Sequence, residues 1–201
     1  VLELHGDDRR HALADVLAGR ADPAGRLPTT FDARVEAHPS NLTYPGEAGE
    51  VHYGEDIFVG YRAFDRTGAE PLFPFGHGLS YTTFAYENVK LDKEEIRPGE
   101  SVTVSLRVAN TGETAGCDVV QVYVGDLESS LLRPTKELKG FQKVRLAPGE
   151  RKDVAIVLDP RAFQAWDPRV HGWVAEPGEF VIYVGWSSAS FAAELPLRLV
   201  E

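Results

Sequence analysis

The hydrophobic pattern divides the chain into two parts of different character. From Phe84 onward, apolar and polar residues alternate, most clearly over residues 102–109, where Val102, Val104 and Leu106 are separated by Thr103 and Ser105. An alternation with a period of two predicts half-buried β-strands. Further stretches with strand character cover residues 119–124, 138–146, 154–158, 180–186 and 191–199. The second part of the chain is therefore predicted to be all β.

Turn signals separate the predicted strands. Three Pro-Gly-Glu tripeptides, at residues 98–100, 148–150 and 177–179, each stand just before a strand, and the Gly suits the positive-φ position of a type II turn. Pro196 cannot donate to a β-ladder, so the last strand is expected at a sheet edge. Residues 160–168 are expected to form a short helical turn with Phe163 and Trp166 against the core. About seven short strands predict an antiparallel β-sandwich of the immunoglobulin or fibronectin type III kind.

The residues before Phe84 follow other patterns. Residues 7–19 predict one helix, since Leu13, Val16 and Leu17 form an apolar stripe and Gly19 suits its end. One amphipathic helix is not a domain, so its apolar face needs a partner outside this chain or later in it. Residues 32–50 are predicted to be a loop, and residues 51–64 an extended segment covering a neighbouring body.

The most distinctive stretch is Pro-Leu-Phe-Pro-Phe-Gly-His-Gly-Leu-Ser-Tyr at residues 71–81, which we call the strap. Its prolines and glycines exclude a helix, and its aromatic residues need a surface to bury them. We expect an extended, irregular segment attached by its aromatic side chains to a body before it and a body after it. The predicted fold is thus mainly β: a sandwich preceded by one helix and a long irregular connector.

Charge and composition exclude some classes of binding partner. The formal net charge of -10 argues against nucleic acid or an anionic membrane as a partner. No apolar run has the length of a membrane span and no export leader is visible, so we expect a soluble protein whose compartment stays open. The single cysteine, Cys117, is expected to be a small buried hydrophobic residue. Because the chain begins at Val1 and contains no methionine, we expect it to be part of a longer protein.

Several ordered stretches resemble the C-terminal region of glycoside hydrolase family 3 enzymes, the β-glucosidase group above all. The stretches that carry the resemblance are residues 12–17, 25–31, 53–55, 59–62, 71–84, 108–112, 119–124, 137–144 and 176–180. The resemblance implies that residues 1–31 are the tail of an α/β sandwich domain, residues 32–83 an interdomain connector and residues 84–201 a fibronectin type III-like domain. One stretch departs from the family: residues 4–8 read Leu-His-Gly-Asp-Asp instead of an aromatic residue followed by Pro-Gly, which argues against a substrate contact there.

The catalytic carboxylates of such an enzyme are expected outside this chain. A retaining glycosidase needs two carboxyl groups roughly 5 to 5.5 Å apart across the scissile bond. Glu55 and Asp56 are the best candidates, but neighbouring residues in an extended segment point to opposite sides, so we assign no catalytic residue. Glu55 is expected instead to form a hydrogen bond to a neighbouring domain. The histidines lack metal-ligand spacing, so no metal site and no cofactor are predicted.

The candidate functional residues are therefore contacts between domains. They are Glu55, Tyr61, Arg62, Phe73, Phe75, His77, Tyr81 and Trp173. His77 is expected to make a structural hydrogen bond within the strap. The three tryptophans could stack on sugars, but Trp166 and Trp186 are expected to be partly buried in the core, and Trp173 to be exposed and to contact the rest of the enzyme.

Three hypotheses follow. In the first, the chain is the C-terminal portion of a β-glucosidase-like enzyme, inactive alone, which stabilises and positions the parent's catalytic domains. The parent would hydrolyse β-glucosides with retention and without a cofactor, so this chain would meet substrate only through the parent. In the second, it is a free-standing β-sandwich that binds carbohydrate or protein. In the third, it is a structural remnant without activity. The exposed apolar surfaces that the first hypothesis requires distinguish it from the second.

Overall fold

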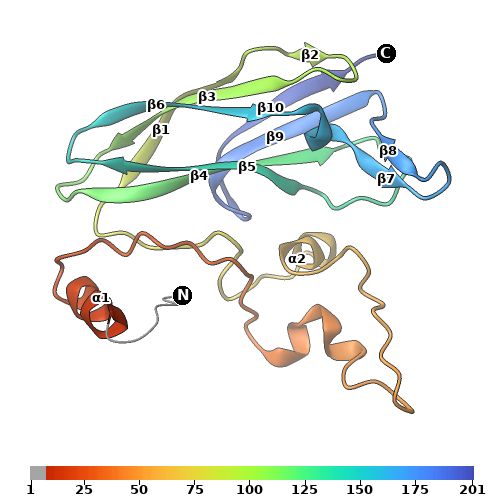
Figure 1. Ribbon diagram of the computed structural model, residues 1–201, viewed down its shortest axis with the longest axis horizontal. Helices are drawn as coiled ribbons and strands as arrows, with labels where there is room; N and C mark the ends of the chain where they lie inside the picture. Colours follow the sequence, from red (N-terminus) through yellow and green to blue (C-terminus); the bar gives the residue numbers. More distant parts are fainter. Residues whose placement is uncertain (1–7) are drawn as a thin grey trace.

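The computed structural model describes residues 8–201 and contains a β-sandwich and an N-terminal segment that lies along one side of it (Figure 1). The predictions for residues 1–7, including the start of the first helix and the family departure at residues 4–8, lie largely outside the described residues. We call residues 8–83 the N-terminal segment. The strap runs between α2 (Tyr61–Thr67) and β1 (Phe84–Leu91), beneath the sandwich in Figure 1.

The sandwich consists of two sheets. One contains β1 (Phe84–Leu91), β3 (Val102–Asn110) and β6 (Arg151–Leu158) in the order β1-β3-β6. The other contains β2 (Glu95–Ile96), β10 (Ser190–Leu199), β9 (Gly178–Ser187), β4 (Gly116–Asp126) and β5 (Glu137–Leu146) in the order β2-β10-β9-β4-β5. Neighbouring strands are antiparallel, except that β2 pairs with β10 in parallel. The prediction of a mainly β, sandwich-type fold is confirmed.

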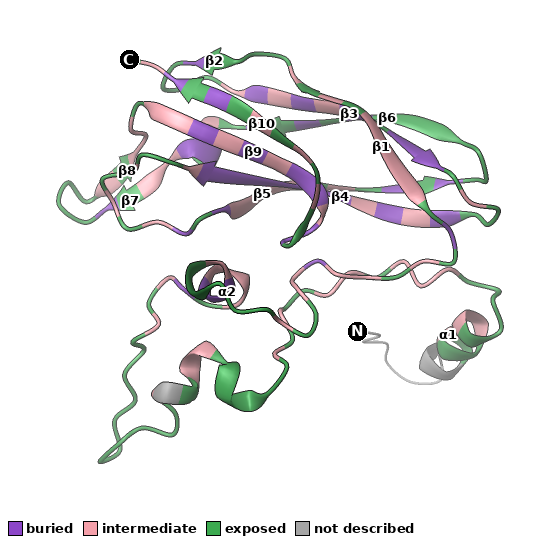
Figure 2. Cartoon of the chain, turned by 180° about the vertical axis from the view of Figure 1, so that it is seen from behind, coloured by how far each residue is buried: buried purple, intermediate pink, exposed green. Residues whose placement is uncertain are grey.

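The core lies between the two sheets, as the alternation predicts. Val102, Val104, Leu106 and Val108 of β3 are buried, whereas the polar residues between them are more accessible. Phe180 of β9 is fully buried and packs edge-to-face on Phe163 at 5.6 Å between ring centroids. Figure 2 shows buried residues concentrated in the strands, with intermediate and exposed residues over most of the N-terminal segment.

Two of the three predicted turns have the expected geometry. Gly99 and Gly149 have φ of 91° and 72°, and the amides of Glu100 and Glu150 close the turns onto the carbonyls three residues earlier. At the third tripeptide the prediction is wrong, because Gly178 already belongs to β9. The expected edge position of the last strand holds for most of its length, since β2 pairs only with Arg198 and Leu199.

The N-terminal segment contains α1 (Asp8–Leu17), the 3-10 turns η1 (Val35–Ala37) and η2 (Pro39–Leu42), and α2 (Tyr61–Thr67). The positive φ of Gly19 follows the end of the predicted first helix. The expectation that residues 51–64 are extended is wrong, because α2 begins at Tyr61. Ala63 and Phe64 are the buried residues of α2, and Gly68 ends it in the left-handed conformation. The alternation of Val59 and Tyr61 concealed this short helix.

The expected helical turn after β6 is η3 (Pro160–Phe163), and Phe163 is buried as predicted. Trp166, by contrast, is not packed against the core as predicted. It lies on the hairpin of β7 (Ala165–Asp167) and β8 (Gly172–Val174), and 48% of its surface is exposed. A two-stranded hairpin has no second layer to cover it, which explains the error. Trp173 is exposed as expected, and Trp186 is partly buried against Tyr86.

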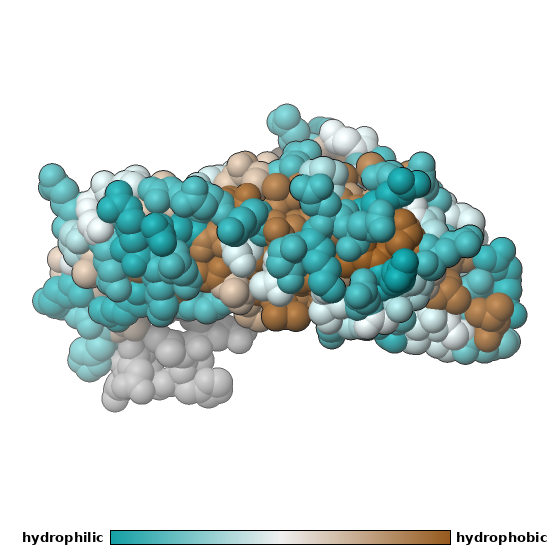
Figure 3. All heavy atoms as spheres, turned by 90° about the horizontal axis from the view of Figure 1, so that it is seen from above, coloured by the Kyte–Doolittle hydropathy of each residue, from teal (hydrophilic) through white to brown (hydrophobic). Residues whose placement is uncertain are grey.

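Seen from the side opposite the N-terminal segment, the sandwich is largely hydrophilic, with apolar residues between the polar ones (Figure 3). This is the surface expected of strands that face water on one side. Within residues 8–201, no helix has the length and apolar character needed to cross a membrane.

Candidate functional site: the junction between strap and sandwich

The strap joins the N-terminal segment to the sandwich through its backbone. The carbonyl of Phe73 accepts from the amide of Phe31 at 2.8 Å, and the amide of Gly76 donates to the carbonyl of Leu27 at 2.8 Å. On the other side, the carbonyl of Phe75 accepts from the amide of Ser188, in the turn between β9 and β10, at 2.9 Å. The strap is thus held on both sides, by residues 27–31 and by the sandwich. We call this region the junction.

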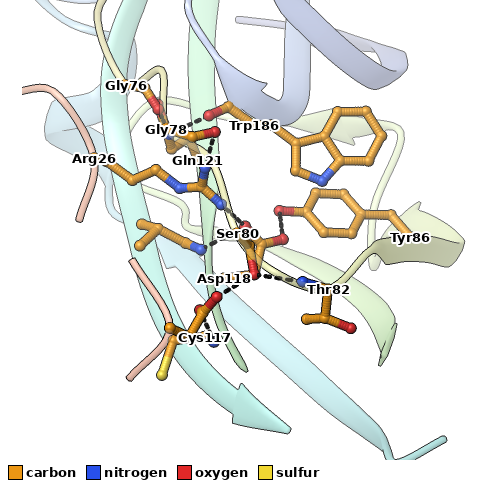
Figure 4. Close-up of polar contacts among 12 residues, drawn as sticks. Arg26, Gly76, Gly78, Ser80, Thr82, Tyr86, Cys117, Asp118, Gln121 and Trp186 are labelled. Carbon is orange, nitrogen blue, oxygen red and sulfur yellow. Dashed lines mark hydrogen bonds and ion pairs between the residues drawn. The ribbon is translucent and has the colours of Figure 1, made fainter. Parts of the chain in front are cut away.

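A buried carboxylate lies at the centre of the junction (Figure 4). Asp118 of β4 is fully buried; it forms an ion pair with Arg26, and its other oxygen accepts from the Tyr86 hydroxyl at 2.9 Å. Arg26 also donates to the carbonyl of Gly78 at 2.7 Å. Since breaking a buried pair leaves an uncompensated charge, this arrangement couples the chain before the strap, the strap and the sandwich.

The buried side-chain amide of Gln121, which also comes from β4, binds the backbone of the strap to the sandwich. The side-chain nitrogen of Gln121 donates to the carbonyls of Gly76, at 3.1 Å, and Trp186, while its oxygen accepts from the Tyr123 hydroxyl at 2.6 Å. Gln121 is 3% exposed and therefore needs these partners, because an unpaired buried amide is costly. The position of Gly76 is thereby specified from the sandwich side.

Both glycines of the strap are required by close approach. Gly76 has a φ of 80°, and a Cβ there would overlap the side-chain amide of Gln121. A Cβ at Gly78 would lie 2.5 Å from the carbonyl oxygen of Gly25 and 2.8 Å from the side chain of Arg26. Only residues without a side chain allow the strap to lie this close to both neighbours.

A second acidic side chain, Asp22, ties the part of the segment that follows α1 to the strap and the sandwich. Asp22 accepts from the Ser80 hydroxyl at 2.7 Å and the Tyr81 amide at 2.8 Å through one oxygen, and from the Cys117 amide at 3.1 Å through the other. The hydroxyl of Tyr81 donates to the carbonyl of Val16 in α1 at 2.7 Å. The thiol of Cys117 is free and only half-buried, so the expectation of a buried cysteine is not met.

Aromatic contacts link α2 to strap and sheet. The ring of Tyr61 lies 5.2 Å from that of Phe75 and 5.8 Å from that of Tyr123, between centroids, and its hydroxyl accepts from the Leu138 amide at 3.0 Å. Next to it, Arg62 forms an ion pair with Glu137 at 2.9 Å. Three candidate contact residues, Tyr61, Arg62 and Phe75, are thus brought together against β4 and β5.

The other candidates lie apart from this cluster. Phe73 packs on Phe31 and stacks on His77, with ring centroids 6.3 and 5.1 Å apart. His77 therefore contributes a stacked ring, and its backbone rather than its imidazole forms the hydrogen bonds of the strap. Trp173 lies on the hairpin at the end of the sandwich.

Glu55 lines a cavity of about 580 Å³ between the 3-10 turns and α2. The cavity is also lined by Phe58, Phe64 and Arg66, and one carboxylate oxygen of Glu55 is buried without a hydrogen-bond partner. Glu55 and Asp56 lie in a turn, where Asp56 has a φ of 52°, rather than in the extended segment expected. Among residues 8–201, no three His, Cys, Asp or Glu side chains are grouped to hold a metal ion.

Burial changes the titration of several groups around the junction. The pKa of Tyr86 is raised well above its ordinary value, mainly by burial and to a smaller extent by the nearby Asp118 carboxylate. Burial likewise raises the pKa of Tyr123. Burial raises the pKa of Asp65 in α2, although an ion pair with Lys136 at 2.6 Å opposes the shift. Tyr86 and Tyr123 are therefore neutral at neutral pH, and their hydroxyls donate hydrogen bonds to Asp118 and Gln121.

Comparison with known proteins places these features in a family. The model of the glycosyl hydrolase family 3 C-terminal domain matches residues 2–81, and that of the fibronectin type III-like domain matches residues 118–188. Thermostable β-glucosidase B of Acetivibrio thermocellus is 48% identical over 188 residues, covering 94% of this chain and 25% of the relative. The chain matches the C-terminal region of family 3 β-glucosidases. It spans about a quarter of the length of the curated relatives that it matches.

Solved family 3 structures have the same fold over nearly the whole chain. The Bifidobacterium adolescentis family 3 β-glucosidase superposes with a TM-score of 0.89 at 40% identity, covering 94% of this chain and 28% of that one. β-Glucosidase 3B of Thermotoga neapolitana, solved with glycerol, superposes with a TM-score of 0.89 at 39% identity, and the match covers 98% of this chain and 27% of that one. The resemblance to family 3 and the sandwich fold are thereby confirmed, whereas the division at residues 31 and 83 stays a prediction.

The stretches that carry the family 3 resemblance meet at the junction. Arg26 comes from residues 25–31, Gly76 from the strap and Gln121 from residues 119–124. Sequence reasoning missed Arg26, Asp118 and Gln121, although one signal was present. Residues 119–124 are more continuously apolar than the alternating strands, which is typical of a strand covered on both faces, and the strap is the second cover.

Proposed function

We propose that this chain is the C-terminal part of a family 3 β-glucosidase-type enzyme, in which it stabilises and positions catalytic domains that lie outside it. The parent would hydrolyse β-glucosides with retention, and its two catalytic carboxylates would come from those domains. The chain would then contact substrate only through the parent. The relatives are β-glucosidases by name, which supports this class of reaction.

The single observation that carries the proposal is the contrast between the two sides of the N-terminal segment. Towards the sandwich, the segment is held by the buried groups of the junction. Other apolar side chains of the segment are left uncovered: Leu17 is 76% exposed and Leu79 72%, and Leu13, Tyr53 and Leu72 are exposed as well. Exposed apolar surface of this kind is typical of a surface that a further protein body covers.

The candidate contact residues have separate roles in this proposal. Tyr61, Arg62 and Phe75 hold the connector on the fibronectin type III-like domain, and Phe73, His77 and Tyr81 set the strap and α1 in place. Glu55 accepts a hydrogen bond from the catalytic body in this proposal, because the residue is only partly buried and its carboxylate has an oxygen without a donor among the described residues. A free-standing module, the alternative, has no need of the exposed side chains.

A chimaera tests the proposal. In the β-glucosidase B of A. thermocellus, the matching C-terminal quarter is replaced by this chain, and hydrolysis of an aryl β-glucoside is measured alongside the truncated enzyme and the chain alone. We expect hydrolysis by the chimaera, with the β-anomer as first product by NMR, and none by the other two. Turnover by the isolated chain, or an inactive but folded chimaera, would refute the proposal.

A matched pair of variants makes the test specific for the exposed surface. We expect Leu17→Ser in the chimaera to lower its thermal stability, and the same change in the isolated chain to have little effect. Lys143→Ser, an exposed position on β5, serves as the control in both proteins. Equal effects of the two changes in the chimaera would mean that α1 is not covered by the catalytic body.

A further inference from the structure

A second hollow, of about 640 Å³, lies at the end of the sandwich that carries the β7–β8 hairpin. It is formed where the connector, the chain before β5 and the hairpin meet. Its lining includes Arg62, Lys139, Arg161, Gln164, Trp166 and Trp173. These side chains combine flat aromatic surface with cationic groups, which the junction does not use apart from Arg62.

Two tryptophans form one wall of this hollow. Trp166 and Trp173 face each other across the β7–β8 pair, with ring centroids 5.5 Å apart at an angle of 66°. Both are about half exposed, at 48% and 46%. The hairpin projects beyond the sheets (Figure 1), so these rings do not contribute to the core. Exposed indoles offer a rigid apolar surface together with an N–H donor, as aromatic anchors in binding sites do.

A guanidinium group is stacked on this wall. The central carbon of the Arg161 guanidinium lies 3.1 Å from the ring centroid of Trp173. Arg161 takes part in none of the ion pairs found among residues 8–201, whereas Arg62 and Lys139, which line the same hollow, both pair with Glu137. A stacked guanidinium keeps its N–H edge free, and that edge matches the two oxygens of a carboxylate.

The charge around the hollow differs in sign from that of the whole chain. Arg62 and Lys139 share one carboxylate, Glu137, at 2.9 and 3.2 Å. The carboxylate of Asp159 caps η3 by accepting from the amide of Ala162. With Arg161 included, the hollow carries surplus positive charge on a chain with a formal net charge of -10. Such a site attracts an isolated anionic group, whereas the chain as a whole repels a polyanion.

We propose that this hollow binds a saccharide that carries a single carboxylate, of the uronic acid type. A pyranose ring would lie against the exposed indoles, and its carboxylate would accept from the N–H edge of Arg161, with the Gln164 amide available for a hydroxyl. Charge-assisted hydrogen bonds of this kind are about twice as strong as neutral ones. The inference goes beyond the proposed function, because it concerns binding by this chain and requires no catalytic domain.

NMR of the full chain tests it, since three indole N–H signals report on three places. Cellobiose and its uronic acid analogue, in which glucuronate replaces the non-reducing glucose, differ only in the carboxylate. We expect the acidic disaccharide to shift the signals of Trp166 and Trp173 with saturation, and cellobiose to bind ~10-fold more weakly. Trp186 stacks on Tyr86 away from the hollow, so its signal should stay unchanged and also reports that the fold persists.

Single substitutions test the two parts of the proposed site separately: the guanidinium of Arg161, which would bind the carboxylate, and the indole rings, which would bind the sugar ring. Arg161→Gln should remove the preference for the acidic disaccharide, and Trp166→Ala should weaken both sugars. Arg145→Gln, an exposed arginine near the other end of β5, is the matched control and should change neither. The proposal is overturned if neither sugar shifts the signals, if both bind equally, if acetate or phosphate alone reproduces the shifts at equal concentration, or if Arg161→Gln keeps the preference.

Discussion

The sandwich and the N-terminal segment bury their side chains in different ways. The sandwich has its own apolar core, in which residues such as Val102, Leu158 and Phe180 are fully buried. The N-terminal segment has few buried apolar residues, Phe58 and Phe64 among them, and most of the exposed large apolar side chains of the described residues belong to it. The sandwich therefore has the features of an independent folding unit, whereas the segment depends on what it contacts.

The attachment between the two regions is correspondingly polar. Asp118, Gln121 and Arg26 hold the strap through directional bonds that work at one geometry only. Apolar packing tolerates small shifts, while a buried amide or carboxylate loses its partners when its neighbour moves. The comparison indicates that the sandwich has its own apolar core and that the junction gives the segment a defined orientation, which the proposed positioning role would require.

The largest expected effect is in the sandwich core. Phe180→Ala should lower the free energy of unfolding by about 3–5 kcal/mol, because it removes a fully buried ring and leaves a cavity. Phe73→Ala is the counterpart in the segment, where the ring is 39% exposed, and should cost well under half as much. Urea denaturation followed by tryptophan fluorescence measures both. Equal losses would mean that the segment belongs to the same folding unit.

The next effect is at the junction. Asp118→Ala leaves Arg26 and the Tyr86 hydroxyl without their shared acceptor and should destabilise the attachment by about 2–4 kcal/mol. Hydrogen exchange should show lost protection at Leu27, Phe31 and Gly76, while the amides of β3 stay protected. Asp153→Ala, which removes an exposed ion pair with Arg107, is the control and should change neither. Uniform loss across the sandwich would contradict this division.

Substitutions at two glycines distinguish the cost of a positive φ from the cost of a steric overlap with a neighbouring side chain. Gly68→Ala places a side chain at a φ of 67° with open space around it and should cost about 1 kcal/mol. Gly76→Ala adds the overlap with the Gln121 amide and should cost about 1–2 kcal/mol more. Thermal denaturation compares the two variants. Similar losses would show that the strap moves freely away from β4.

High pH should weaken the same contacts. Because the folded-state pKa of Tyr86 and Tyr123 lies above the unfolded value of about 10, their contribution to stability is complete below that pH and is lost as the pH rises beyond it. Ultraviolet absorbance should show these two tyrosines ionising only as the chain unfolds. Tyr86→Phe should reduce the pH dependence, and early ionisation of all seven tyrosines would contradict the buried junction.

The smallest effect is expected on the exposed side of α1. Leu17→Ser in the isolated chain should change the free energy of unfolding by no more than about 0.5 kcal/mol, because the side chain is 76% exposed. Thermal denaturation of the isolated chain is the measurement. A larger loss would show that α1 already has a partner within this chain.

The strands were predictable, and much of the N-terminal segment was not. The alternation at Val102–Val108 reflects one face in the core and one in water, a pattern that sequence displays directly. The helix at Tyr61 was missed because two buried residues in a seven-residue helix leave too short a periodic signal. Trp166 was misplaced because nothing local distinguishes a strand inside a sheet from one in an uncovered hairpin.

For the candidate site, the sequence identified the strap and its aromatic residues but not their partners. Asp118 and Gln121 look like ordinary polar positions in a strand, and Arg26 lies 92 residues before Asp118 along the chain. What the sequence by itself determined is the set of elements, since burial periodicity and turn chemistry are local properties. Only the tertiary structure decided which polar groups lose water and must therefore pair, because burial of a side chain depends on residues distant in sequence.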